Sequence, residues 1–119
     1  MNASVILVVQ DNTILRHFAI MMVEEDGFDV VGARDTAEAL KVLELRSDIR
    51  VIFTDVDMGA GKEGIWLALQ VRNRWPLIQI IVTSGHHNVT PNLLPSGAVF
   101  FAKPYAEDLV MREISRMAA

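Results

Sequence analysis

Polar side chains suited to phosphate chemistry follow four short apolar runs of the chain, each where the run ends. Gln10 and Asp11 follow the run 6–9, and Asp55 follows the run 51–54. Thr83 and Ser84 follow the run 80–82, and Lys103 follows the run 99–102. If the runs are neighbouring strands of one parallel sheet, these residues share one edge, because open parallel sheets bind ligands outside the carboxyl ends of their strands. Two carboxylates, a hydroxyl and an ammonium group would then converge on one small site.

The elements that must position these residues alternate between strand and helix. Apolar runs predict strands near 4–9, 28–33, 50–54, 78–83 and 98–102. Helices are expected from about residue 11 to Asp26-Gly27, from the Asp35…Glu38 capping box, across 66–75, and from 105 to about 117. Strands alternating with helices of roughly ten to fifteen residues predict right-handed βαβ units and a doubly wound parallel sheet.

Apolar stripes predict which faces of the helices point to the core. In the first helix the expected core-facing residues are Ile14, Leu15, Phe18, Met21 and Met22. In the last helix they are Leu109, Val110, Ile114 and Met117. A further helix is due within 86–97, but Pro95 follows Pro91 too soon for more than about one turn. About five helices are therefore expected, the fourth short or irregular.

Composition excludes several classes of function. The 119 residues are 51% hydrophobic and 22% charged, which predicts one compact α/β domain over residues 1–119. A net charge of -4 without a Lys/Arg block argues against direct nucleic-acid binding, and the absence of cysteine excludes thiolate chemistry. No basic leader and no apolar run of ~20 residues is present, so no membrane segment and a cytoplasmic location are expected.

Five motifs in chain order carry a resemblance to a known family. They are Asp11 after the first strand, Asp55 after the third, the Asp55…Met58…Gly64 loop, Thr83 after the fourth strand, and Lys103-Pro104 after the fifth. From about residue 4 to 117 the chain resembles a response-regulator receiver domain, the phosphoacceptor module of two-component signalling. The resemblance implies a flavodoxin-like sheet of five parallel strands in the order 2-1-3-4-5.

The resemblance also implies a reaction and a cofactor. Asp55 would accept a phosphoryl group from a phosphohistidine of a sensor histidine kinase or histidine phosphotransfer protein. Mg²⁺ would bind Asp11, Asp55, the backbone carbonyl of Asp57 and, through a water molecule, Gln10. The chain would catalyse only its own phosphorylation and dephosphorylation. It would act as a monomer or weak homodimer on a downstream protein partner.

A switch is implied at the ends of the last two strands. Lys103 would pair with Asp55 before transfer and with a phosphate oxygen afterwards. Thr83 would swing inward to bond the phosphate beside Ser84, and Phe100, three residues before the lysine, would follow it. This movement would change a partner-binding surface.

Several residues depart from the family pattern. Gln10 stands where a second acidic residue is usual, and because it carries no charge, Mg²⁺ affinity should fall. Asp57 adds a carboxylate where many relatives carry a neutral residue. Met58-Gly59 replaces Met-Pro, and Phe100 replaces a frequent tyrosine.

Two other functions stay open from the sequence. Gln10 favours a receiver-like scaffold that binds partners without being phosphorylated. Asp55-Val56-Asp57 also resembles the D-x-D motif of haloacid-dehalogenase-like phosphatases, in which the first Asp is the nucleophile and the second a general acid. Against the phosphatase, that motif follows the first strand of its domain, whereas Asp55 follows the third predicted strand of this chain.

Overall fold

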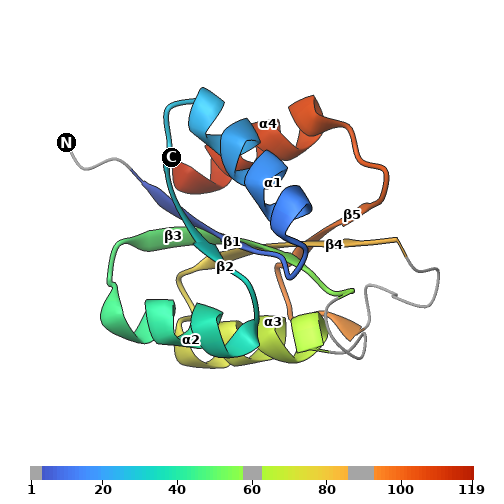
Figure 1. Cartoon of the computed structure of the whole chain (residues 1–119). Helices are drawn as coiled ribbons and strands as arrows, with labels where there is room; N and C mark the ends of the chain where they lie inside the picture. Colours follow the sequence, from blue (N-terminus) through green and yellow to red (C-terminus); the bar gives the residue numbers. More distant parts are fainter. Residues whose placement is uncertain (1–3, 58–62, 86–92) are drawn as a thin grey trace.

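A computed structural model describes residues 4–57, 63–85 and 93–119 of the chain. Five parallel strands form one sheet in the order β2-β1-β3-β4-β5 (Figure 1), which confirms the predicted flavodoxin-like topology. The strands are β1 (Val5–Val9), β2 (Asp29–Ala33), β3 (Ile49–Asp55), β4 (Gln79–Ser84) and β5 (Val99–Ala102). β1 and β3 lie in the middle of the sheet, so their carboxyl ends are enclosed on both sides.

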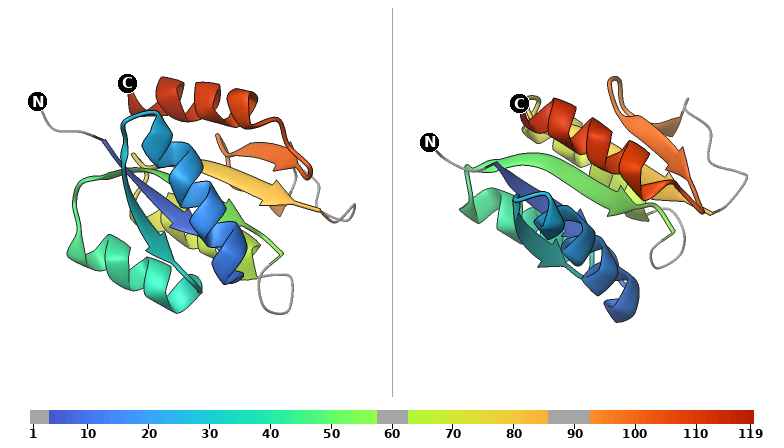
Figure 2. Two further views of the ribbon diagram at one scale, coloured as in Figure 1. Left: turned by 45° about the horizontal axis from the view of Figure 1, so that its top comes forward. Right: turned by 90° about the horizontal axis from the view of Figure 1, so that it is seen from above.

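Helices cover both faces of this sheet. The described residues contain α1 (Thr13–Glu25), α2 (Thr36–Leu45), α3 (Glu63–Arg74) and α4 (Glu107–Ala118). α1 and α4 run along one face, and α2 and α3 cover the other (Figures 1 and 2). The predicted fourth helix falls partly outside the described residues, and the described part, 93–98, contains no α-helix. Within the described ranges, no helix is long and apolar enough to cross a membrane.

Alternating side chains of the central strands build two cores. Leu7 and Val9 of β1 pack toward α2 and α3, whereas Ile6 and Val8 pack toward α1 and α4. All five residues of β1 are buried. A strand buried on both faces has no polar side, which explains why the sequence reads there as a continuous apolar run.

Local signals set two of the helix boundaries as the sequence predicts. α1 ends before Gly27, whose φ of 89° lies in the left-handed region and whose N–H donates to the carbonyl of Glu24 at 2.9 Å. α2 begins after Asp35, whose carboxylate accepts the Glu38 N–H at 2.8 Å. Glu38 in turn accepts the N–H of Arg34, so the capping box is formed in a slightly shifted register.

The predicted core face of α1 is wrong for four of its five residues. Ile14, Leu15, Phe18 and Met21 are exposed, and only Met22 is buried. The face that meets the sheet instead carries Ala19, Ile20 and Val23. α1 has apolar residues on two sides, so periodicity alone could not choose between them. Arg16 lies on the sheet-facing side as well, where its aliphatic stem packs with Ile20 over Gly32 of β2.

The inner face of α4 differs from the prediction at one position. Val110, Ile114 and Met117 are buried as expected, but Leu109 is exposed and Met111 takes its place in the core. The buried set therefore follows the i, i+1, i+4, i+7 spacing of one helical face, starting at Val110.

Arg72 near the end of α3 joins three segments of the chain. Its guanidinium donates to the carbonyls of Ser96 at 3.0 Å, Pro76 at 2.9 Å and Ile78 at 3.2 Å. One side chain thus links the segment before β5 to the connection between α3 and β4 by hydrogen bonds. The described part of that segment, 93–98, contains no α-helix.

Candidate functional site

Asp55 ends β3 at the middle of the sheet edge that the sequence predicts for the site. It is only 5% exposed and lies beside Thr83 in the β3–β4 register. The next residue, Val56, donates its N–H to the carbonyl of Thr83 at 2.9 Å, so the two strand ends stay paired past the carboxylate. A carboxylate buried to this degree requires charged or hydrogen-bonding partners.

Lys103 is the cationic partner of Asp55. It follows β5, and its Nζ lies 2.6 Å from Asp55 Oδ2. The backbone N–H of Lys103 donates to the carbonyl of Ser84 at 2.9 Å, which fixes the start of the side chain beside β4. Charge-assisted hydrogen bonds of this length are among the stronger ones in proteins.

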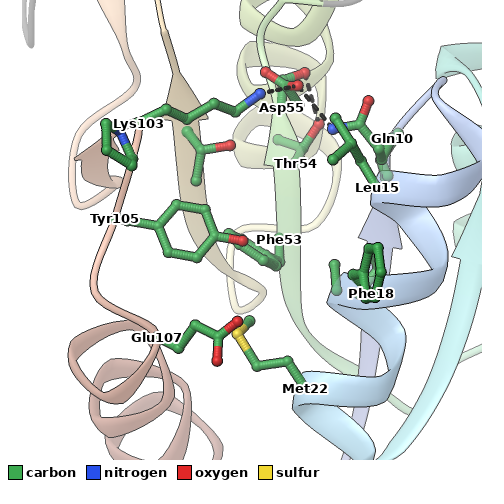
Figure 3. A pocket seen from close by; sticks show the side chains of 15 residues that line it. Gln10, Leu15, Phe18, Met22, Phe53, Thr54, Asp55, Lys103, Tyr105 and Glu107 are labelled. Atoms are coloured by element: carbon green, nitrogen blue, oxygen red, sulfur yellow. Dashed lines mark hydrogen bonds and ion pairs between the residues drawn. The ribbon is translucent and has the colours of Figure 1, made fainter.

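Two neutral donors complete the environment of Asp55. Gln10 Nε2 donates to the same Oδ2 at 2.8 Å, and the backbone N–H of Asp57 donates to Oδ1 at 2.9 Å. Figure 3 shows Lys103 and Gln10 reaching Asp55 from opposite sides of the site. Both carboxylate oxygens therefore accept hydrogen bonds.

The side chain of Asp57 connects β3 to the end of β4. Its Oδ1 accepts the Ser84 hydroxyl at 2.8 Å, and its Oδ2 accepts the Gly85 N–H at 2.7 Å. Lys103 Nζ also lies 4.0 Å from Asp57 Oδ2. One ammonium group thus faces two carboxylates, with an excess of negative charge among these three side chains.

Gly64 explains how α3 can begin so close to Asp55. A Cβ atom at this position would lie 2.3 Å from Val56 Cα and 2.5 Å from the carbonyl oxygen of Asp55. Real Cβ atoms do not approach backbone so closely, so no residue but glycine fits. Gly64 of the Asp55…Met58…Gly64 motif thus lies against the end of β3, while Met58 and Gly59 lie outside the described residues.

A groove of about 540 Å³ runs from Asp55 between α1 and the β5–α4 segment (Figure 3). Its lining residues include Leu15, Phe18, Ala19, Met22, Phe53, Thr83, Tyr105 and Glu107. The Tyr105 ring packs edge-on against Phe53 with centroids 5.9 Å apart. Burial raises the pKa of the Tyr105 phenol, and the carboxylates of Glu107 and Asp55 raise it further, so the hydroxyl is protonated at neutral pH.

The oxygen ligands at this edge fit a hard divalent cation. Mg²⁺ is commonly held by one or two carboxylates, with water and phosphate oxygens filling its other positions. Asp55 and Asp57 offer carboxylate and carbonyl oxygens, and Asp11 is an exposed carboxylate at the start of α1. Among the described residues, no three acidic or histidine side chains form a metal-binding group by themselves. With only one or two carboxylates as ligands, Mg²⁺ would fill its other positions with water.

The structure gathers most, but not all, of the predicted residues. Hydrogen bonds connect Asp55 to Gln10, Lys103 and the Asp57 N–H, and connect Asp57 to Ser84. Thr83 lies beside Asp55 in the sheet. Phe100 does not reach this edge: it pairs with Val82 and packs with the core under α2 and α3.

Some residues of the site were not predicted. The apolar lining from Phe18, Phe53 and Tyr105 was missed, because their spacing alone resembles ordinary core. Arg16 was also missed, although its Nη1 donates to the carbonyl of Gln10 at 2.9 Å. An arginine among apolar residues of a helix is the signal that could have found it.

Comparison with known proteins agrees with this geometry. The family model described as "Response regulator receiver domain" matches residues 6–115. A putative response regulator NtrX-like protein of Rickettsia bellii is 25% identical over 93% of this chain, and the aerobic respiration control protein ArcA of Escherichia coli is 30% identical over 84%. The crystal structure of a response regulator receiver protein from Pseudomonas putida is 28% identical, covers 98% of each chain and has a TM-score of 0.85.

The chain matches only a part of its longer relatives. It spans 24% of the NtrX-like protein and 42% of ArcA. The match to the family model covers all or most of each of the five strands and four helices described above. It does not favour a haloacid-dehalogenase-like phosphatase. The chain therefore belongs to the response regulator receiver domain family of two-component signalling.

Proposed function

We propose that Asp55 of this receiver domain accepts a phosphoryl group from a phosphohistidine of a sensor histidine kinase or histidine phosphotransfer protein. The contact of 2.6 Å between Asp55 and Lys103 is the observation that supports this best. A buried carboxylate at the ends of parallel strands, next to a single ammonium group, offers a nucleophile and a charge that stabilises developing negative charge.

The proposed reaction forms one bond and breaks one. An oxygen of Asp55 attacks the phosphorus, and the N–P bond breaks and leaves the imidazole with the electron pair. Phosphoryl transfer asks the protein mainly for positioning and charge neutralisation. Lys103 would neutralise an equatorial oxygen, and the Thr83 and Ser84 hydroxyls would donate to the others. Hydrolysis of the acyl phosphate would return Asp55 to its starting state, so the chain acts on no substrate but itself.

Mg²⁺ would offset negative charge on the transferring group when it is bound. Asp11, Asp55 and the Asp57 backbone carbonyl are the proposed ligands, and Gln10 is the proposed partner of a metal-bound water. Lys103 supplies a second positive charge, 2.6 Å from Asp55 Oδ2.

The surface proposed for the phosphohistidine donor is the exposed face of α1. Ile14, Leu15, Phe18 and Met21 form an apolar patch on α1, and Leu15 and Phe18 also line the groove that leads to Asp55. Exposed apolar clusters next to a reactive site are typical of protein interfaces. A macromolecular donor must bring its histidine to Asp55, and this patch is continuous with that approach.

The proposed output is a two-state switch. Moving a population from 1:99 to 99:1 takes about 5.5 kcal/mol of differential stabilisation. Lys103, Thr83 and backbone N–H groups would form charge-assisted hydrogen bonds to the phosphoryl group, each contributing about 1.5–3 kcal/mol. Two or three of these bonds together could supply the differential stabilisation. Phe100 stays the predicted reporter of the switch. A cytoplasmic location and a monomeric or weakly dimeric state also remain predictions.

Intact mass after incubation with acetyl phosphate, with and without Mg²⁺, tests the proposal. The expected result is a Mg²⁺-dependent gain of one phosphoryl group that is absent in Asp55→Asn. An adduct that persists in Asp55→Asn would place the acceptor elsewhere. No adduct at any Mg²⁺ concentration would favour the phosphorylation-independent scaffold, which the hydrogen bond from Gln10 to Asp55 makes the second candidate.

A further inference from the structure

Each polar atom of Gln10 has a partner within the fold. Its backbone N–H donates to the carbonyl of Ala33 at 3.0 Å, and its backbone carbonyl accepts Arg16 Nη1 at 2.9 Å. Its side-chain Oε1 accepts the Asn12 N–H at 3.1 Å, while Nε2 donates to Asp55 Oδ2 at 2.8 Å. The residue is 8% exposed. Both its backbone and its amide are therefore held in one position.

The orientation of this amide follows from the chemistry of its partners. A carboxylate can only accept hydrogen bonds and a backbone N–H can only donate them. Turning the amide over would set Oε1 against Asp55 and Nε2 against the N–H of Asn12, losing both bonds. The side chain is thus an N–H donor aimed at the acceptor carboxylate.

We propose that Gln10 is a positioning residue that holds the Asp55 carboxylate in place without a metal and thereby weakens Mg²⁺ binding at that carboxylate. Oδ2 already accepts Lys103 and Gln10, and Oδ1 accepts the Asp57 N–H. A cation that approaches Oδ2 meets two donors there, the Gln10 amide and the Lys103 ammonium group, and competes with both for the lone pairs of this oxygen. The link to Mg²⁺ rests on the metal site of the proposed function but not on phosphoryl transfer, and the effect on the metal-free fold rests on neither.

A carboxylate at position 10 would behave in the opposite way. Gln10→Glu keeps the length of the side chain and replaces the N–H donor with an oxygen. Two carboxylates would then face each other at a buried position, with Lys103 bonded to Asp55 and Arg16 bonded to the backbone carbonyl of residue 10. The metal-free fold should lose stability, and a divalent cation between the two oxygens should restore it.

Thermal unfolding of the full chain in EDTA and along a Mg²⁺ titration tests the proposal. The wild-type chain is expected to change little with Mg²⁺. Gln10→Glu is expected to melt lower in EDTA, to gain stability with Mg²⁺, and to bind Mg²⁺ roughly tenfold more tightly, a change of about 1.4 kcal/mol. Gln79→Glu is the matched control, because it makes the same chemical change at an exposed position at the far end of β4.

Gln10→Met removes the donor without adding charge, which covers the case in which Gln10→Glu does not fold. A purely structural role of Gln10 would leave Mg²⁺ affinity unchanged or reduced in Gln10→Met. The proposal expects a gain of roughly two- to tenfold, because the hydrogen bond from residue 10 to Asp55 no longer has to be displaced. Equal melting temperatures in EDTA and equal Mg²⁺ affinities for wild type and Gln10→Glu, or no gain in Gln10→Met, would overturn it.

These readouts are independent of phosphorylation. If acetyl phosphate gives no adduct but the Gln10 variants shift Mg²⁺ affinity as expected, the proposed function fails and this inference stands. If the adduct forms and the Mg²⁺ affinities of the variants do not shift, this inference fails and the proposed function stands.

Discussion

At the scale of single residues, Asp55 and Lys103 form an ion pair in which each charge is stabilised by the other. The carboxylate is nearly fully buried, and the ammonium group is the one cation bonded to it among the described residues. Removing one partner of such a pair leaves the other charge with neutral donors only. Lys103→Met is expected to lower the free energy of unfolding by about 1–3 kcal/mol, measured by urea denaturation.

A double-mutant cycle separates this pair from general effects of the substitutions. Asp55→Asn combined with Lys103→Met removes both charges and leaves no unpaired carboxylate at that position. The double variant should be more stable than Lys103→Met, with a coupling energy of about 1 kcal/mol or more. Strict additivity of the two substitutions would show that the contact contributes nothing to stability.

Residue-level prediction from the sequence worked where strand order alone fixes proximity. Asp55, Thr83 and Lys103 meet because β3, β4 and β5 are neighbours that end at the same edge. The bonds from Asp57 to Ser84 and Gly85 were not predicted, because they depend on the path of the chain after the strands end. Hydrogen-bond partners at loop positions follow from backbone geometry, which residue types do not specify.

The contact between the start of α3 and the end of β3 gives a prediction at the scale of elements. In Gly64→Ala the new methyl group would collide with backbone atoms of Asp55 and Val56, and backbone cannot yield as a side chain does. Overpacking typically costs about 1–3 kcal/mol, and here we expect about 3 kcal/mol or more. Urea denaturation measures the loss, and amide shifts of Asp55 and Val56 should report the displaced strand end.

Gly85→Ala is the matched control for this substitution. A Cβ atom at Gly85 would have its nearest neighbour, Asp57 Oδ2, at an ordinary 3.6 Å. Its stability should stay within about 0.5 kcal/mol of the wild type. Equal stability of the two variants would mean that α3 starts farther from β3 than described.

α1 shows why a helix can be predicted correctly and still be rotated wrongly. The apolar residues of α1 occupy two adjoining faces, and the larger side chains, such as Phe18, lie on the exposed one. Ranking by size and hydrophobicity therefore selects the wrong side. Ala19, Ile20 and Val23 face the sheet instead, and they pack in the core with Ile6 and Val8 of β1.

At the scale of the whole molecule, exposed apolar side chains lie at both ends of the sheet, but only those of the proposed donor surface on α1 lie next to the site. Phe18 on α1 is 62% exposed beside the groove to Asp55, and Leu77 before β4 is 90% exposed at the opposite end. Phe18→Ser is expected to slow phosphoryl transfer from a sensor kinase by at least about tenfold, as loss of an interface anchor would. Transfer is followed with a kinase that phosphorylates the wild-type chain.

Two comparisons make this experiment specific. Leu77→Ser removes an equally apolar side chain and should leave transfer from the kinase unchanged. Phosphorylation of Phe18→Ser by acetyl phosphate should match the wild type, because a small donor needs no docking surface. Slowing with both donors would indicate damage to the site itself and would contradict a role of α1 in recognition.

The Arg72 contacts have a consequence for how this chain can diverge or be recombined. Gly85 is hydrogen-bonded to Asp57, and Ser96 is hydrogen-bonded to Arg72. Both ends of the stretch between Gly85 and Ser96 are therefore held by residues outside that stretch. A sequence exchanged from a homologue between these two attachment points would inherit fixed entry and exit positions. Chimeric proteins that exchange this stretch should therefore keep the neighbours of Asp55, because Asp57 and Arg72 both lie outside the exchanged stretch.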